Sequence, residues 1–251
     1  MFLENYCHIS DEKITFTRQQ ASDFAKQIAD DFNPLHNIDA KRFCVPGDLL
    51  FALILERAGL HQEMSFKFSG MVTDATTLNI PTEITTTASI IDDKAKEYLN
   101  MSVAGHSTKN SKAIESLTRA YVEFSGHTFP HILVELMKEN KVMINPARPM
   151  IMYESMSIQL EQLDFQDITL RLSSTTLAQE GKRGNACLSF DLVSQGIVIG
   201  HGKKFMLLSG LPNITRLKLV TLPRKHNLHN LYNTKSIKFV PTQKLSKIGI
   251  T

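Results

Sequence analysis

Hydrophobic residues near the start of the chain recur at the spacing of an α-helix. One helical face is formed by residues at i, i+3, i+4 and i+7, namely Ala21, Phe24, Ala25 and Ile28. Thr17 and Gln20 have the spacing of a capping box, so we expect this helix to begin there. Asn33 precedes Pro34, and helical backbone is disfavoured before a proline. The helix is therefore predicted to end near Asn33, with Asp31 on its last turn.

A second helix is predicted between Pro46 and Gly59, two residue types that are common at a helix start and a helix end. Its middle, Leu49–Leu55, is apolar on every side, so we expect the rest of the fold to enclose it. Strand candidates separated by turn-like clusters follow at 65–68, 77–80, 84–91, 97–104 and 113–124. The last of these has alternating apolar positions at Ala120, Val122 and Phe124.

A second cycle of one helix and several strands begins after Gly126. Helical spacing within Pro130–Asn140 predicts a helix, with Ile132–Met137 in the enclosed position. Strands are predicted after it at 150–153, 157–163, 168–175, 186–193 and 197–208. The pairs Lys182-Arg183 and Lys203-Lys204 are interpreted as charged turns. The pattern predicts an α+β protein with two units, 1–126 and 127–211, and a C-terminal extension, 212–251.

Composition indicates an ordinary globular protein. Of 251 residues, 42% are hydrophobic and 21% are charged, and the apolar run at 49–55 is too short to cross a bilayer. Three isolated cysteines, Cys7, Cys44 and Cys187, have neither disulfide nor metal-site spacing, which favours a reducing cytoplasm. The histidine pairs at 127/131 and 226/229 lack other ligands nearby, so no metal site is expected.

Positive charge is concentrated in the extension. From Leu211 onward there are eight basic residues and no acidic one, which leaves 20 basic against 25 acidic residues in the rest of the chain. Such a segment can contact nucleic acid, anionic lipid or coenzyme phosphates, or pack on its own acidic body. Its apolar patch Ile237–Val240 favours packing, so nucleic-acid binding is not expected.

The segment Asp31–His36 carries the best candidate chemistry. A turn at its Asn-Pro step can bring the Asp31 carboxylate and the His36 imidazole to one point, where they can share a water for acid–base catalysis. A purely structural role is the alternative, with His36 bonded to a backbone carbonyl. Asn33 suits the turn itself, and Cys44 is a packed thiol rather than a nucleophile.

Three stretches together resemble the MaoC-like, R-specific enoyl-CoA hydratases, and the chain as a whole resembles a bacterial branch of that family. They are Phe24-Ala25, the segment Asp31–His36 and Pro46–Leu50. The resemblance implies a hotdog fold, a long helix wrapped by antiparallel sheet, here expected twice in one chain. It also implies catalysis by Asp31 and His36, with Asn33 and Gly47 contacting an acyl thioester of coenzyme A or acyl carrier protein. No separate cofactor is implied, and a homodimer is compatible with the resemblance.

Two departures from the family pattern keep other functions open. Only Asn37–Pro46 separates His36 from Gly47, which is shorter than usual in the family, and Pro46 stands where a histidine is common. The alternatives are a non-catalytic acyl-ligand-binding or regulatory hotdog protein, and a hotdog thioesterase, because one fold can support several functions.

Overall fold

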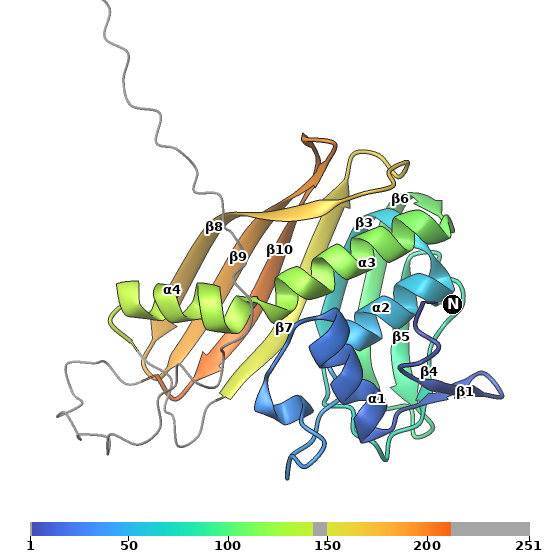
Figure 1. Cartoon of the computed structure of the whole chain (residues 1–251), viewed down its shortest axis with the longest axis horizontal. Helices are drawn as coiled ribbons and strands as arrows, with labels where there is room; N and C mark the ends of the chain where they lie inside the picture. The colour runs from blue at the N-terminus through green and yellow to red at the C-terminus, as the bar shows by residue number, and fades with distance from the viewer. Residues whose placement is uncertain (1, 143–149, 212–251) are drawn as a thin grey trace, which may run out of the picture. The chain divides into compact units, whose positions relative to one another are not determined.

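The computed structural model describes residues 2–142 and 150–211, which are coloured in Figure 1. The basic extension predicted at 212–251 lies outside the described residues, so what was predicted for its docking and its partners stays a prediction. None of the helices in the described part of the chain is long and apolar enough to cross a membrane.

The described strands form one antiparallel sheet in the order β1-β2-β4-β5-β6-β3-β7-β10-β9-β8 (Figure 1). Their bounds are β1 His8–Ser10, β2 Lys13–Thr15, β3 Leu60–Phe68, β4 Leu78–Asn79, β5 Thr87–Asp92, β6 Glu97–Thr108, β7 Met150–Leu160, β8 Thr169–Glu180, β9 Arg183–Ser194 and β10 Ile197–Ser209. Every predicted strand segment except 113–124 lies in this sheet or overlaps it. A large antiparallel sheet with few helices agrees with the predicted α+β class.

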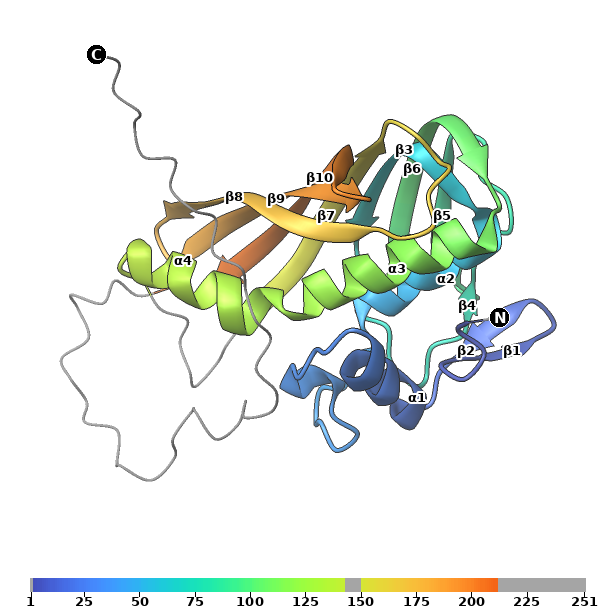
Figure 2. The same cartoon turned by 45° about the horizontal axis from the view of Figure 1, so that its top comes forward.

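Helices cover one face of the sheet, where α2 and α3 lie side by side (Figures 1 and 2). The helical segments are α1 Arg18–Asp23, the π-helix η1 Phe24–Ile28, the 3-10 helix η2 Pro34–His36, α2 Gly47–Ala58, α3 Ser111–Gly126, the π-helix η3 Thr128–Leu133 and α4 Val134–Glu139. Every residue from Leu49 to Leu55 is at most 2% exposed. The prediction of an enclosed second helix is therefore confirmed, as is the capping box of Thr17 and Gln20 at the start of α1.

The strand predicted at 113–124 is wrong, because this segment is most of α3. Its alternating apolar positions belong to a helical pattern whose buried members include Ala113, Ile114, Leu117, Tyr121 and Val122. The start of the helix is fixed by Asn110, whose side-chain oxygen accepts hydrogen bonds from the backbone N–H groups of Lys112 and Ala113. Alternation over a few residues did not distinguish the strand period of two residues from the helical period of about 3.6 residues.

The helix predicted at 130–140 exists, as η3 and α4, but it is not enclosed. Leu133, Leu136 and Met137 are buried against β8, β9 and β10 in a smaller hydrophobic cluster, while Val134 is 42% exposed. The helix that packs beside α2 is α3. The expectation that Ile132–Met137 is wrapped like Leu49–Leu55 is therefore wrong.

The sheet continues without a break from the first cycle into the second. β3 pairs with β7 from Glu63↔Gln159 to Lys67↔Ser155, and β7 is one strand where two short ones were predicted. The predicted unit boundary after Gly126 falls between α3 and η3. Lys203 and Lys204 do not form a turn, because both lie within β10.

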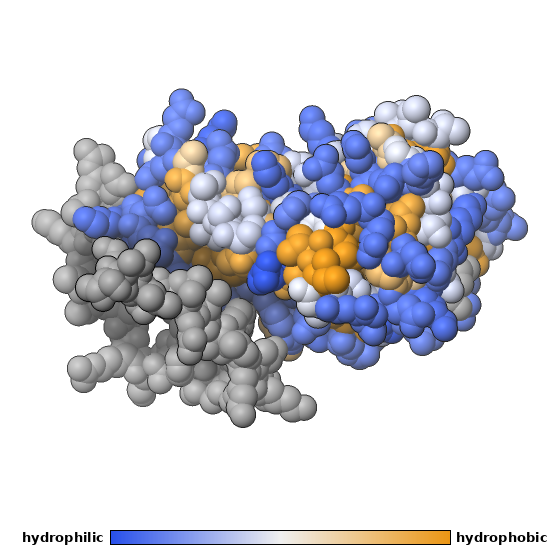
Figure 3. Space-filling view, turned by 90° about the horizontal axis from the view of Figure 1, so that it is seen from above, coloured by the Kyte–Doolittle hydropathy of each residue, from blue (hydrophilic) through white to orange (hydrophobic). Residues whose placement is uncertain are grey.

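Figure 3 views the molecule from above and shows polar residues over much of this side, with smaller apolar patches between them. Some large hydrophobic side chains remain exposed elsewhere among the described residues. Three of them belong to one short segment beside the candidate site: Phe32 at 47%, Leu35 at 36% and Ile38 at 45%.

Candidate functional site

The turn that carries Asp31 closes the first helix earlier than predicted. The helical backbone ends at Ile28, and Asp30 adopts a positive φ of 49°. The Asp31 N–H then donates to the Ala25 carbonyl at 2.8 Å. A left-handed residue followed by such a backward bond is a common helix ending, and aspartate tolerates that conformation better than most residues. Asp31 therefore lies beyond the helix and not on its last turn, which corrects the prediction.

Asn33 organises the segment between the helix and His36. Its N–H donates to Asp31 Oδ1 at 2.8 Å, and its side-chain oxygen accepts from the Leu35 N–H at 3.1 Å, at the start of η2. These contacts give Asn33 the turn-forming role expected of an asparagine before proline. The substrate contact that the resemblance implied for Asn33 stays a prediction.

His36 is held in a fixed orientation beside Asp31. Its Nδ1 lies 2.7 Å from the Cys44 carbonyl oxygen, and because a carbonyl only accepts, Nδ1 carries a proton. Its Nε2 lies 3.5 Å from Asp31 Oδ2. This separation is longer than a good hydrogen bond of about 2.7–3.2 Å. The two groups therefore face each other at near-contact distance, with no room for another atom between them, so a shared water would have to lie beside both.

Two opposing effects act on the proton of His36. Burial lowers its pKa, whereas the nearby Asp31 carboxylate, the Cys44 carbonyl and the charge of Asp48 all raise it. The net result is a pKa above the usual value of histidine. The imidazolium form is therefore favoured beside Asp31 to a higher pH than in a solvated histidine.

Gly47 is the first residue of α2 and follows Pro46, as predicted. A side chain added there would lie 3.1 Å from the Phe68 ring and 3.6 Å from the Tyr153 ring. These two rings stack at a centroid distance of 4.4 Å. The N-terminal end of α2 thus abuts aromatic side chains from β3 and β7. Its predicted contact with a thioester carbonyl stays a prediction.

A buried polar cluster that the sequence analysis missed lies on α2, α3 and β10. Ser125 Oγ donates to Asp48 Oδ2 at 2.5 Å, and Lys204 Nζ donates to Ser125 Oγ at 2.5 Å and to the Ser125 carbonyl at 3.4 Å. Lys204 Nζ also lies 4.4 Å from the centre of the Tyr153 ring, whose hydroxyl hydrogen-bonds Tyr121. We call Asp48, Ser125 and Lys204 the buried triplet.

The electrostatics of the buried triplet reach the Asp31–His36 pair. Burial raises the pKa of Asp48 and lowers that of Lys204, while their opposite charges act against both changes. The charges of Asp31 and His36 also act on Asp48, and that of Asp31 acts on Lys204. Burial together with the Asp48 charge also holds the pKa of Tyr121 and of Tyr153 well above the usual range. These ionisable groups therefore form one coupled site.

One sequence signal could have located Lys204. In β10 the buried positions alternate as Gly202, Lys204, Met206 and Leu208. The cross-strand partners of Lys204 are Met156 on β7 and Leu188 on β9, both buried and apolar. A lysine in the buried row of a strand needs a partner. Asp48 and Ser125 carried no comparable signal in the sequence.

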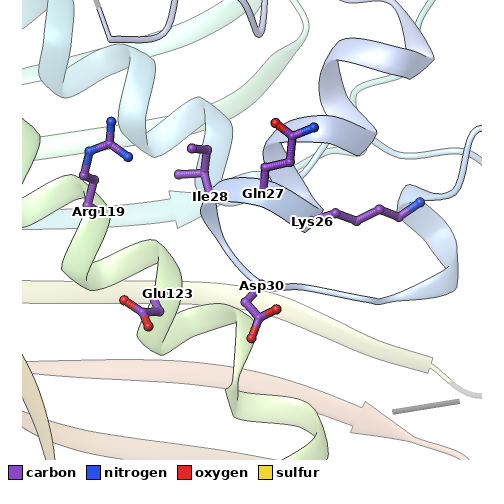
Figure 4. Close-up of a pocket in the computed structure, with 6 residues that line it drawn as sticks. All are labelled: Lys26, Gln27, Ile28, Asp30, Arg119 and Glu123. Atoms are coloured by element: carbon purple, nitrogen blue, oxygen red, sulfur yellow. The ribbon is translucent and has the colours of Figure 1, made fainter. Parts of the chain in front are cut away.

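Two hollows in the described part of the chain are large enough to note, and neither is lined by Asp31 or His36. The first, of about 360 Å³, is lined by Lys26, Gln27, Ile28, Asp30, Arg119 and Glu123 (Figure 4). The second, of about 500 Å³, lies on the sheet, with lining residues that include Ser65, Gln159, His201 and Lys203. Figure 4 shows Asp30 and Glu123 on neighbouring segments at the edge of the first hollow.

The described residues contain no group of three side chains suited to hold a metal ion. His127 Nε2 instead lies 2.6 Å from Asp30 Oδ2, and its ring meets that of His131 at a centroid distance of 5.9 Å. The histidine pair at 226/229, for which no metal site was expected, lies outside the described residues.

Cys44 is expected to react slowly with thiol reagents. Burial raises its pKa to about 11, from 9.0, although a backbone hydrogen bond at Val72 opposes the change. Its thiolate fraction at neutral pH is thus about 100-fold below that of a solvated thiol. Timed labelling of native protein with iodoacetamide, followed by peptide mass spectrometry, measures this. Labelling of Cys44 as fast as a free cysteine would contradict it and would reopen a nucleophilic role.

Comparisons with known proteins place the fold in context. A conserved protein of unknown function with a hot dog fold from Alicyclobacillus acidocaldarius is 8% identical, with a TM-score of 0.44 over 83% of this chain and 98% of that one. The acyl-CoA thioesterase II TesB2 from Mycobacterium marinum is 9% identical, with a TM-score of 0.43 over 84% and 98%. No curated protein matches the chain. The family described as "Protein of unknown function (DUF3581)" matches residues 1–216, and the chain belongs to that family.

Proposed function

We propose that this protein hydrates a 2-enoyl thioester, or dehydrates the R-3-hydroxyacyl thioester, with coenzyme A or acyl carrier protein as the thiol part. The observation that carries the proposal is the 3.5 Å approach of His36 Nε2 to Asp31 Oδ2, with His36 fixed by the Cys44 carbonyl. An acid and a base that face each other at this distance can act on the two ends of one water addition. The arrangement also fits the family resemblance of the Asp31–His36 segment.

The raised pKa of His36 favours this residue as the acid and Asp31 as the base. An imidazolium is a proton donor, so His36 delivers the proton to the substrate α-carbon. Asp31 accepts the proton of the water that attacks the β-carbon. Dehydration uses the same two groups in reverse. The first turn of α2 at Gly47 stabilises the enolate oxygen with oriented N–H dipoles.

The exposed apolar side chains beside the pair supply a surface for the acyl chain. Phe32, Leu35 and Ile38 stay 47%, 36% and 45% exposed within eight residues of Asp31. Three exposed hydrophobic residues in one short segment favour contact with an apolar ligand.

We further propose a fused double hotdog, with α2 against β1–β6 and the α3–α4 segment against β7–β10.

A second candidate function is the binding of an acyl ligand without turnover. The observation that favours it is the position of the two hollows, since neither is lined by Asp31 or His36. The interior beside α2 is also occupied by aromatic side chains, with Phe51 against Phe66 and Tyr121. A hotdog thioesterase is a third reading, and the same experiment distinguishes it.

Purified protein incubated with crotonyl-CoA and longer 2-enoyl-CoAs is expected to consume the conjugated double bond without releasing thiol. Loss of enoyl-thioester absorbance measures hydration, and a thiol-reactive dye in a parallel cuvette measures thioester hydrolysis. Release of thiol would contradict hydration and indicate that the protein is a thioesterase. Binding of acyl-CoA with neither reaction, at every chain length tested, would indicate that the protein binds an acyl ligand without turnover.

A further inference from the structure

Burial of the charged groups of the triplet costs free energy of desolvation, so a role in function is a reasonable explanation for it. Lys204 is 4% exposed and Asp48 is 6% exposed, and both belong to rows of otherwise apolar positions on β10 and α2. A buried ion pair is often no more stable than a well-packed apolar pair of the same volume. In addition, Asp48 Oδ1 has no hydrogen-bond partner among the described residues. Stability alone does not account for this arrangement.

We propose that Asp48 and Lys204, joined through Ser125, are positioning residues for the Asp31–His36 pair. The positive charge of Lys204 favours the ionised form of Asp48, and the Asp48 carboxylate favours the protonated form of His36. This inference rests on the proposed function, in which protonated His36 is the acid. Ser125 forms the physical link, because its hydroxyl contacts both Asp48 Oδ2 and Lys204 Nζ at 2.5 Å. The next residue, Gly126, packs against the backbone of Ala29 and Asp31, which places the buried triplet beside the turn that carries the pair.

Among the described residues, the groups that act most strongly on His36 and on Lys204 come from several elements. His36 meets the Asp31 carboxylate and the Cys44 carbonyl, and the charge of Asp48 on α2 favours its imidazolium form. Lys204 meets Ser125 on α3 and the Tyr153 ring on β7, and the charges of Asp48 and Asp31 favour its ammonium form. Its neighbours across the strands, Met156 and Leu188, are apolar.

The proposal predicts an unusual sign. If Lys204 were an independent positive charge, its removal would make His36 easier to protonate. In the coupled arrangement, removal of Lys204 leaves Asp48 buried without a counter-charge, and burial then favours its neutral form. His36 loses the Asp48 negative charge and becomes harder to protonate. The two views therefore predict opposite shifts of the His36 titration midpoint.

The experiment is an NMR titration of ¹⁵N-histidine-labelled full-length protein, with His36 assigned by the loss of its signals in His36→Gln. Lys204→Met is expected to lower the His36 midpoint relative to wild type. Lys203→Met is the matched control, because Lys203 is the exposed neighbour on the same strand, and it should leave the midpoint unchanged. A raised or unchanged midpoint in Lys204→Met would overturn the proposal.

The double variant Asp48→Asn/Lys204→Met removes both buried charges and protects the test against misfolding of the single variant. Its His36 midpoint is expected to fall below that of wild type and to match that of Asp48→Asn alone. A wild-type midpoint in the double variant would overturn the proposal. Because NMR measures protonation directly, a protein inert on every enoyl thioester would contradict the hydration proposal and leave this result interpretable.

Discussion

Replacing Gly126 with alanine is expected to lower the free energy of unfolding by about 3 kcal/mol, at the upper end of the usual range for overpacking. A methyl group at Gly126 would lie 1.8 Å from the Ala29 carbonyl oxygen and 3.1 Å from the Asp31 backbone nitrogen. These are backbone atoms of the turn that ends the first helix, so the turn or the end of α3 must move. Chemical denaturation followed by circular dichroism measures the loss.

The expected sign is opposite to that from helix propensity, since alanine is favoured over glycine by about 1 kcal/mol within a helix. Gly181→Ala is the matched control, because Gly181 has a φ of +58° and nothing within 4 Å of an added methyl group. It should lose only about 1 kcal/mol, from the left-handed conformation. A Gly126→Ala protein as stable as wild type would contradict the close packing of α3 on the turn. The same displacement would move Asp31, so activity should fall as well.

Replacing Asp31 with asparagine is expected to reduce the hydration rate by about 100-fold or more, the usual effect of removing a general base. Asparagine keeps the shape of the side chain and can still accept the Asn33 N–H bond, so the turn should survive. It cannot take a proton from water. Initial rates with the enoyl-CoA that the wild type hydrates fastest, at saturating concentration, measure the change in kcat.

Asp30→Asn provides the control for this variant. Asp30 is adjacent in sequence, has a half-exposed side chain and pairs with His127 at 2.6 Å instead of with His36. Its replacement should leave kcat within a few-fold of wild type. Equal losses in the two variants would mean that the turn, and not the Asp31 carboxylate, is what the reaction needs.

The buried helix could be predicted because its sequence permits few other environments. Seven consecutive apolar residues at Leu49–Leu55 must be enclosed, whatever encloses them. The strands of the second half could be predicted because their apolar and polar residues alternate over many positions. Such a long alternation fits a strand and does not fit the period of a helix. The prediction for the segment 113–124 failed because its apolar positions fit both the helical and the strand period, and the helix-capping residue Asn110 lies just outside the segment.

The candidate site was predicted in part. Asp31 and His36 lie together because the Asn-Pro step and the Asn33 side chain act locally, within six residues. The turn with the left-handed Asp30, which moves Asp31 off the helix, packs against Gly126, a residue far away in sequence. The buried triplet forms only where α2, α3 and β10 meet. Of its three residues, only Lys204 could be suspected from the sequence, because it lies in the buried row of β10. A pair of adjacent lysines suggests a turn until the strand around it is read as a whole.

The ladder between β3 and β7 has a consequence for how the chain folds. Its five pairs, from Glu63↔Gln159 to Lys67↔Ser155, join residues that are far apart in sequence, while most other pairs in the sheet join neighbouring hairpins. Loop closure of that length is slow compared with hairpin formation. The nascent first half therefore exposes the unpaired edge of β3 until β7 arrives. Such an edge is a template for strand addition from another chain, so a chain cut after Gly126 should aggregate.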